Sequence, residues 1–433
     1  MDTVLSLTKN YAGKTLENSV YSKISKAAFI ILLFFAFFGT AIPFRPRIED
    51  VEQISSSNII NQVLYSVLFL VSIITLIPKK DELFTVVKTE KFLFLFMGYA
   101  LLSMAWSDYS FVTFKRIFQI ITIVLTSVSF LLYADSTDDI LKHFKYIVYL
   151  YLFLSIIVVF IIPGAKDPQF HTWRGFTSHK NTLGQISLIS TILCYIFYKS
   201  ADSLNKKSIA LFMMFIAIAL LFGAYSSTSI LTFLFFIGML LLLSLDYIFK
   251  PIGIGRTFSI TTAVIFFILI LGVMIFLPQF EKLVPALFGK DTTFSGRTDL
   301  WEYLLNEIKL HPVIGTGYQA YWVPDNRNLL ILYKSFVWLP NQAHNGYLDI
   351  LLQNGIIGLA LVIMMLFNYF INFIKIHKPH PWVWFVVVSL ITNFQESTLL
   401  RPGQMMDFMF LFAYVMLFVN RYRNFVWERY SAE

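Results

Sequence analysis

Long apolar runs separated by short polar segments make up most of the chain. A transmembrane helix needs about 20 mostly apolar residues, and twelve stretches fit this template. They lie at 27–44, 59–77, 92–106, 117–133, 146–163, 183–198, 208–224, 229–249, 258–278, 347–373, 381–395 and 405–420. The stretch at 183–198 fits least well because it contains several polar residues. The pattern predicts an all-α polytopic membrane protein with about twelve transmembrane helices.

The longest polar stretch covers residues 279–346, between the ninth and tenth predicted helices. Within it, TDLWEYLLNEIKL (298–310) has apolar residues at roughly helical spacing. These residues are Leu300, Tyr303, Leu304, Ile308 and Leu310. We therefore expect a large loop with short amphipathic helices. We expect the 298–310 helix to lie on the membrane surface, and we expect a packing role in a cap formed by the loop before any role in ligand binding.

Composition supports a membrane protein and gives an orientation. The chain is 57% hydrophobic and 14% charged, whereas soluble domains carry about 25% charged residues. The net charge of +8 is therefore not taken as a sign of nucleic-acid binding, because basic residues collect on the cytoplasmic loops of membrane proteins. With the N-terminus inside, the cytoplasmic segments hold twenty Lys and Arg, against eight in the short loops opposite.

This orientation predicts a single integral membrane domain over residues 1–433. The tails at 1–26 and 421–433 are then cytoplasmic, and the 164–182 and 279–346 loops are extracytoplasmic. The N-terminal region is polar for about 26 residues, and the first apolar run is long enough to remain as a span, so no cleaved signal is expected.

Polar clusters gather on the predicted extracytoplasmic face. They are WRGFTSHKNTLGQ (173–185), YSSTS (225–229), TFSGRTDLW (293–301) with HPVIGTGYQAYW (311–322), and AHNGYLD (343–349). Ionisable residues at a bilayer are costly and indicate function. Their cationic or titratable side chains are Arg174, His179, Lys180, Arg297 and His344. The nearby acids in these clusters are Asp299 and Asp349.

A cationic pocket at a membrane surface suits an anionic group such as a lipid diphosphate. Arginine presents a planar fork that matches phosphate oxygens, and helix N-termini add unpaired N–H groups. Asn345 is placed to cap a helix that starts at Gly346. His344 would then lie at the mouth of that helix.

His344 has two interpretations at this stage. Histidine titrates near neutral pH, so it can take a proton from a hydroxyl group. Alternatively, His344 only precedes the helix and forms hydrogen bonds with the backbone. This structural role is the more frequent one for a lone histidine. The neighbouring cations favour the functional role.

The sequence contains no motif typical of a metal site or a nucleotide-binding site. The sequence has no HxxxH or CxxC spacing. It also lacks a P-loop or dinucleotide fingerprint, and PIGIG (251–255) is only a short turn between apolar runs. We expect no metal, no cofactor and no nucleic-acid partner.

The ordered clusters resemble the O-antigen ligase superfamily, over about residues 90–400. Its members are O-antigen ligases, O-antigen polymerases and exopolysaccharide polymerases. The matching positions are Arg174-Gly175, His179-Lys180-Asn181, Gly184, Ser295-Gly296-Arg297, Trp301, Pro312, Gly315, Gly317, Tyr318, His344-Asn345, Gly355 and Gly358, and WSD (106–108) with Arg116 resembles an early family pattern.

The resemblance implies a metal-independent, inverting glycosyltransferase with a GT-C-like membrane fold. Its donor would be a glycan on undecaprenyl diphosphate, presented at the periplasmic face. By resemblance, Arg297 and Arg174 would hold the diphosphate, His344 would activate the acceptor hydroxyl, and Asn345 would fix the histidine. Further residues implied in substrate binding are His179, Lys180, Asn181, Ser226, Thr228, Tyr318 and Trp322. Tyr318, Tyr321 and Trp322 either stack on sugar faces or pack the loop onto the bundle.

One departure from the ligase pattern concerns YSSTS. Many ligases carry an arginine where this chain has Ser227, which leaves one diphosphate contact of the ligase pattern in doubt. Ser226 and Thr228 are closer to the exopolysaccharide polymerase branch.

Several functions remain open. The first is a polymerase of lipid-linked oligosaccharide repeat units in an exopolysaccharide or O-antigen, acting in the inner membrane on a glycan or lipid acceptor, with a chain-length regulator and a flippase as partner proteins. The second is a ligase that moves a finished glycan onto a lipid A core or another acceptor. A transporter or flippase belongs to a different class; against it, the clusters lie on one face, whereas transporter sites lie near the midplane. An O-acyltransferase is a weaker rival.

Overall fold

The computed structural model describes residues 2–39, 58–167, 171–249, 296–323, 326–335, 340–375 and 381–423. Within these ranges the fold is helical, and the one β-bridge joins Lys166 to Trp173. The helices are α1 (Asp2–Phe38), α3 (Ile59–Leu76), α4 (Lys80–Thr89), α5 (Lys91–Leu102), α6 (Ser110–Tyr133), α7 (Thr137–Ile161), α8 (Lys180–Ser200), α9 (Leu204–Gly223), α10 (Ser227–Phe249), α12 (Gly296–Leu310), α13 (Arg327–Ser335), α14 (Gly346–Lys375), α15 (Val383–Thr392) and α16 (Met405–Arg423).

The helices confirm a polytopic membrane protein. Seven of the described helical stretches are long and apolar enough to cross a membrane, and four shorter apolar helices accompany them. Eleven predicted spans coincide with these seven and four elements. The predicted span at 258–278 lies outside the described residues, as does most of the 279–346 loop before α12.

The least convincing predicted span, 183–198, is one of the most enclosed helices. α8 has 78% of its apolar window buried, and it packs against α7, α9, α10 and α16. Its polar residues Ser187, Ser190 and Thr191 are all buried. A helix surrounded by other helices does not need an all-apolar surface, because small hydroxyl side chains allow close helix packing within a membrane.

Small polar side chains also join the N-terminal helices. Ser72 of α3 shares a 2.8 Å hydrogen bond with Thr126 of α6, and Thr75 shares one of 2.8 Å with Ser129. Ser129 is also 2.7 Å from Ser25 of α1. These buried pairs hold α1, α3 and α6 in a fixed register.

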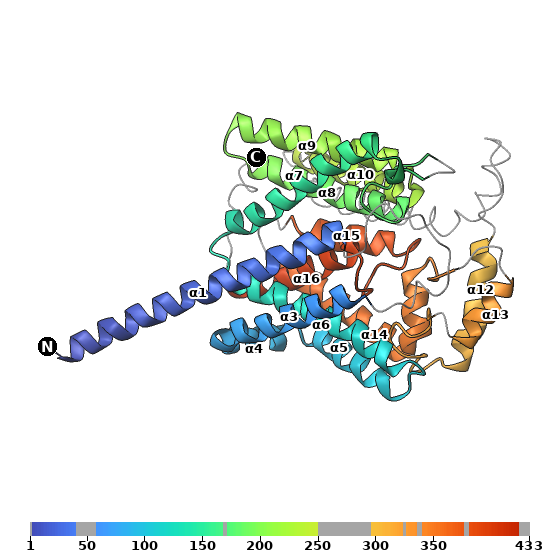
Figure 1. The fold of residues 1–433 in the computed structure, drawn as a ribbon, viewed down its shortest axis with the longest axis horizontal. Helices are drawn as coiled ribbons and strands as arrows, with labels where there is room; N and C mark the ends of the chain where they lie inside the picture. Colours follow the sequence, from blue (N-terminus) through green and yellow to red (C-terminus); the bar gives the residue numbers. More distant parts are fainter. Residues whose placement is uncertain are drawn as a thin grey trace.

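α12, α13 and the segment 311–323 form a cap with its own small hydrophobic core. Leu300, Leu304 and Ile308 of α12 pack there with Tyr321 and Trp322. The apolar stripe of the predicted 298–310 helix is thus buried inside the cap, although Leu310 is 66% exposed. This favours a packing role for the helix, and its place on the membrane surface stays a prediction. The cap lies at the end of the bundle opposite the start of α1 (Figure 1).

The cap packs against α14 at Gly355, where the helix is interrupted. Gly355 has a non-helical backbone with φ of +62°, and a Cβ atom there would lie 2.2 Å from the carbonyl oxygen of Val313. The interruption leaves backbone N–H and C=O groups of α14 without partners inside the helix. Segment 312–317 forms hydrogen bonds with them. The bonds are Ile356 N–H to Pro312 O (2.9 Å), Ile357 N–H to Val313 O (3.2 Å), Thr316 N–H to Leu352 O (3.1 Å) and Gly317 N–H to Gln353 O (2.9 Å).

This docking fixes the first part of α14, residues 346–354, beside the connection between α15 and α16. Irregular backbone at membrane depth is tolerated where protein covers it. The glycines at 315, 317 and 355 all have positive φ, so they serve the docking of the cap onto the broken helix. That docking positions the start of α14, where the candidate site lies.

Candidate active site

Glu396, in the connection between α15 and α16, is the centre of the candidate site. Its side chain is only 4% exposed. Oε1 accepts a 2.9 Å hydrogen bond from Asn181 Nδ2, and Oε2 accepts one of 2.6 Å from Gln342 Nε2. A buried carboxylate needs such partners, because an unpaired charge is very costly away from water.

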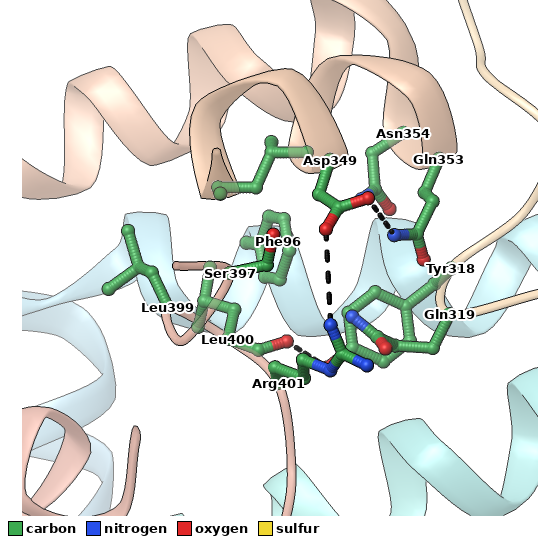
Figure 2. A pocket seen from close by; sticks show the side chains of 12 residues that line it. Phe96, Tyr318, Gln319, Asp349, Gln353, Asn354, Ser397, Leu399, Leu400 and Arg401 are labelled. Carbon is green, nitrogen blue, oxygen red and sulfur yellow. Dashed lines mark hydrogen bonds and ion pairs between the residues drawn. The ribbon is translucent and has the colours of Figure 1, made fainter. Parts of the chain in front are cut away.

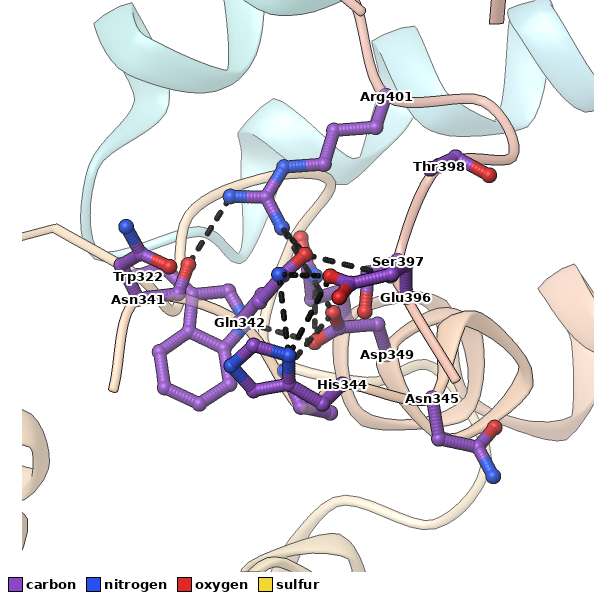
Figure 3. A network of polar contacts seen from close by, with 12 residues as sticks. Trp322, Asn341, Gln342, His344, Asn345, Asp349, Glu396, Ser397, Thr398 and Arg401 are labelled. Carbon is purple, nitrogen blue, oxygen red and sulfur yellow. Dashed lines mark hydrogen bonds and ion pairs between the residues drawn. The ribbon is translucent and has the colours of Figure 1, made fainter. Parts of the chain in front are cut away.

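His344 is the third partner of this carboxylate. Its Nδ1 lies 3.3 Å from Glu396 Oε2, and the side chain is 17% exposed. A carboxylate only accepts hydrogen bonds when ionised, so we assign the proton of neutral His344 to Nδ1. The lone pair is then on Nε2, which points away from Glu396 (Figure 3). Histidines held in this way by a carboxylate act as general bases through the far nitrogen.

Arg297, the second residue of α12, completes the group that surrounds Glu396. Its Nη2 lies 3.9 Å from Oε1. We call Asn181, Arg297, Gln342, His344 and Glu396 the Glu396 cluster. Three of its members, Asn181, Arg297 and His344, were predicted site residues from three separate sequence clusters, and the structure brings them together.

The charges around Glu396 hold it in the ionised form. Burial, the largest single influence, raises the pKa of this carboxyl group. The hydrogen bond and charge of His344, the charge of Arg297 and the hydrogen bond from Gln342 all lower it. Together they outweigh burial, so the pKa lies below the ordinary glutamate value. Glu396 therefore supplies a fixed negative charge beside His344 at neutral pH.

The start of α14 fixes the backbone around His344. Asn345 Oδ1 accepts hydrogen bonds of 3.1 Å from the N–H groups of both Tyr347 and Leu348, which confirms the predicted N-cap. The N–H of Gly346 donates to Asn393 O at 2.8 Å, and a Cβ at Gly346 would lie 1.9 Å from Asn393 Oδ1. His344 itself adopts a positive φ of +50°. These constraints leave its side chain little freedom of direction.

Asp349 lies one turn further along α14, and both of its carboxylate oxygens accept structural hydrogen bonds. Its Oδ1 accepts a 2.6 Å hydrogen bond from Trp322 Nε1, and its Oδ2 accepts one of 3.1 Å from Ala343 N–H. Arg401 lies 4.0 Å from Oδ2. Trp322 is only 8% exposed. Asp349 and Trp322 therefore tie the cap to the start of α14.

Tyr318 has a similar environment. It is 1% exposed, and its hydroxyl donates a 2.6 Å hydrogen bond to Leu400 O. Its backbone N–H donates to Ser103 Oγ at 3.0 Å. The contacts of Tyr318 and Trp322 favour packing of the loop onto the bundle over stacking on a sugar. A role in substrate binding stays a prediction for both residues.

A small polar pocket lies beneath the cluster, between the start of α14 and the 397–401 segment (Figure 2). Asp349, Gln353 and Asn354 line one side and Arg401 the other. Gln353 Oε1 and Asn354 Oδ1 are buried without a hydrogen-bond partner. Buried polar atoms of this kind are commonly satisfied by an ordered water molecule.

The remaining predicted residues lie at two other places. Arg174 is buried and donates a 2.8 Å hydrogen bond from Nε to Gly164 O. His179 is the N-cap of α8, where Nδ1 accepts from Asn181 N–H at 3.1 Å, and Lys180 is the first residue of that helix. These residues belong to the same segment as Asn181, so they lie near the entry of α8 rather than directly on Glu396.

Ser226 and Thr228, by contrast, are buried at the start of α10. Ser226 Oγ donates to Ser229 Oγ at 3.1 Å. A Cβ atom at Gly184 of α8 would lie 2.8 Å from Ser226 Cβ. This is close packing of α8 against α10, and a role for Ser226 and Thr228 in substrate binding stays a prediction.

Sequence analysis missed Glu396, Gln342 and Arg401. The signal was present for Glu396, because an acid directly after an apolar run, on a face rich in cations, is itself an ionisable residue at the bilayer. The analysis singled out Asp299 and Asp349 as the nearby acids instead. Asp299 is exposed, and Asp349 holds the cap.

The Glu396 cluster is equipped for proton transfer beside cations. Across the described residues, no three or more His, Cys, Asp or Glu side chains gather in a way that could hold a metal ion. The cluster pairs a histidine that contacts a carboxylate with a partly exposed guanidinium group. This combination suits a reaction in which an activated hydroxyl group attacks a substrate and an anionic group leaves.

The sequence is similar to those of proteins named for polysaccharide production or ligation. Residues 212–363, which include Arg297 and His344, match the family described as O-Antigen ligase. The exopolysaccharide production protein ExoQ of Rhizobium meliloti (strain 1021) is 30% identical over 215 residues, 47% of this chain and 48% of that protein. RP358 of Rickettsia prowazekii (strain Madrid E), named as a polysaccharide ligase, is 25% identical over 300 residues, 67% of this chain and 70% of that protein. The matched region therefore spans about half the length of ExoQ.

Proposed function

We propose that this protein is a glycosyltransferase of the bacterial inner membrane, because residues 212–363 match the O-antigen ligase family and the described residues form a helical membrane protein. Its donor is an oligosaccharide repeat unit on undecaprenyl diphosphate, and its product is a longer polysaccharide chain. The active site faces the periplasm and is the Glu396 cluster.

The observation that carries this proposal is the pairing of His344 with Glu396 at 3.3 Å. The hydroxyl of the acceptor sugar gives its proton to His344 Nε2 as its oxygen attacks C1 of the donor sugar. The C1–O bond to the diphosphate breaks, and the leaving group takes the electron pair. The ionised Glu396 stabilises the imidazolium that forms. Attack from the face opposite the diphosphate inverts the configuration at C1.

Cations stabilise the leaving diphosphate. Arg297 lies at the start of α12 with its side chain 19% exposed, so its guanidinium can reach a phosphate placed above Glu396. Lys180 and the N-terminus of α8 supply further positive charge near Asn181. Arg174 is the second arginine assigned to the diphosphate. A single donor aimed at developing negative charge is worth about 3 kcal/mol.

Polymerisation is the first choice among transfer reactions because of the similarity to ExoQ, a protein named for exopolysaccharide production. Ser226 and Thr228 resemble the same branch. A ligase reaction, with a lipid A core or another molecule as acceptor, is the second candidate. It is supported by the longer alignment with RP358.

Reconstitution of the purified protein with an undecaprenyl-diphosphate repeat unit tests the proposal. A ladder of product lengths from donor alone identifies a polymerase, whereas transfer only after a lipid A core is added identifies a ligase. Absence of any covalent product in both assays would favour a transporter and refute the proposal. Because the mechanism needs no metal, chelators should leave the yield of product unchanged, and inhibition that added divalent metal reverses would contradict it.

A further inference from the structure

Gln342 links the two sides of the candidate site through all of its polar atoms. Its Nε2 donates to Glu396 Oε2 at 2.6 Å and lies 3.3 Å from His344 Nδ1. Its Oε1 accepts from Ser397 N–H at 3.2 Å and from Arg401 Nη1 at 3.1 Å. The side-chain amide thus touches both members of the His344–Glu396 pair and both residues that flank the site on the 396–401 segment (Figure 3).

The backbone on either side of Gln342 is held as firmly as its side chain. Arg401 Nη2 donates to Asn341 O at 2.9 Å, and Ala343 N–H donates to Asp349 Oδ2 at 3.1 Å. Ala343 is fully buried. Residues before and after Gln342 are therefore anchored to charged side chains, which leaves the amide itself a single direction.

The amide orientation follows from its neighbours. A carboxylate and a protonated guanidinium cannot exchange roles, so the NH₂ group must face Glu396 and the carbonyl oxygen must face Arg401. With its NH₂ directed at Oε2, Gln342 cannot accept a hydrogen bond from His344. The acceptor that faces the proton on Nδ1 of His344 is then Glu396 Oε2, at 3.3 Å.

We infer that Gln342 is a positioning residue that fixes the tautomer and the basicity of His344 through Glu396. The inference rests on the proposed function, because it assigns His344 as the base of the transfer reaction. Gln342 keeps Glu396 Oε2 in place and neutralises part of its charge by hydrogen bonding. Loss of this control should change the proton affinity of His344, and not only the stability of the fold.

Two substitutions separate this role from a structural one. Gln342→Met keeps the size of the side chain but removes both polar groups. Gln342→Glu keeps the acceptor for Arg401 and Ser397 and places a carboxylate within reach of His344. The nearby Arg401 allows the new carboxylate to ionise. The matched controls are Gln404→Met and Gln404→Glu, because Gln404 lies in the same 393–404 connection. Among the described residues, its bond is made by the backbone oxygen, which accepts from Phe408 N–H at 3.1 Å.

The experiment measures product formation against pH and, on the same nanodisc-embedded protein without substrate, the titration of His344 by histidine-selective NMR. His344→Gln assigns the signal. For Gln342→Glu we expect the acid limb of kcat/KM and the His344 titration both to move up by about one pH unit. For Gln342→Met we expect a roughly tenfold lower kcat with an unchanged donor KM. The Gln404 variants should match the wild type.

An unmoved His344 titration in Gln342→Glu, with a folded protein, would overturn the inference. So would Gln342→Met with wild-type kcat. The two readouts also separate the inference from the proposed function. If the NMR titration shifts but the wild-type protein forms no covalent product, Gln342 controls His344 as inferred, and the glycosyl transfer reaction is what fails.

Discussion

Two polar clusters lie at helix entries on the capped end of the bundle, and they differ in how their side chains are used. In the Glu396 cluster, long side chains from the starts of α8 and α12 and from the segment before α14 meet on one buried carboxylate. At the start of α10, the short hydroxyl side chains of Ser226 and Ser229 bond to each other and pack against Gly184. The sequence patterns look alike, but only the first cluster combines opposite charges with partial exposure.

The comparison teaches that a polar cluster at a membrane boundary is a stronger functional indicator when its side chains can reach beyond their own helix. Arg297 and His344 keep 19% and 17% of their side chains exposed, whereas Ser226 is 1% exposed. A side chain that reacts with a bound substrate must be accessible, whereas a side chain that packs two helices together must be buried.

The largest effect should come from His344→Ala, which removes the base. Since general base catalysis contributes about 10²- to 10⁴-fold, we expect product formation to fall by about 10³-fold. Binding of the donor should be nearly unchanged, because His344 acts on the acceptor. The initial rate of the reconstituted reaction and donor binding by the same preparation are the two measurements.

His311→Ala is the matched control for this prediction. His311 is exposed on the cap after α12, so its replacement should leave both quantities near the wild-type value. If His344→Ala abolishes donor binding as well, His344 is a structural residue or a phosphate ligand, and the contrast with Ser226 loses its mechanistic basis.

Arg297→Ala should give the second largest effect. Loss of one cation directed at the leaving diphosphate costs about 3 kcal/mol, or roughly a 100-fold lower kcat/KM. Arg297→Lys should recover only part of the loss, since lysine lacks the planar fork. Arg327→Ala, on the exposed first residue of α13, is the control. Equal losses in both arginine variants would show a general charge effect on the cap instead of a role at the site.

The fold class and eleven of the predicted spans could be read from the sequence because apolar length is a local property. The convergence of Asn181, Arg297 and His344 could be expected only as a shared face of the membrane. Their common partner, Glu396, depends on how the break of α14 at Gly355 docks the cap and places residue 344 beside the α15–α16 connection. That arrangement joins segments more than fifty residues apart, and no local pattern encodes it.

The ionised state of Glu396 gives a smaller, pH-dependent effect on stability. Its pKa is lowered in the folded protein, so its stabilising contribution is present above the ordinary glutamate pKa of about 4.3. The contribution is lost as pH falls through the lower pKa of the folded state. We expect wild-type thermal stability in detergent to fall below about pH 4.

Glu396→Gln should lower stability at neutral pH by about 2 kcal/mol, since bonds to a charged acceptor are lost, and should flatten the decline in acid. Glu302→Gln, at an exposed position of α12, should follow the wild-type profile. A Glu396→Gln protein with the same acid sensitivity as wild type would show that other carboxyl groups control the transition.

The smallest effect on catalysis should come from Ser226→Ala, and this substitution tests the other half of the comparison. If Ser226 only packs α10 against α8, removal of its Oγ should leave kcat/KM within about twofold of wild type, because one buried hydroxyl bond contributes only about 1 kcal/mol to stability.

Gly184→Ala should act on stability instead. Its new Cβ would lie 2.7 Å from Ser229 Oγ and 2.8 Å from Ser226 Cβ, and overpacking of this kind costs about 1–3 kcal/mol. Thermal unfolding and product formation, measured on both variants, separate the two effects. A Ser226→Ala protein that folds normally but loses activity as His344→Ala does would place the start of α10 in the active site, and the two clusters would then be parts of one substrate channel.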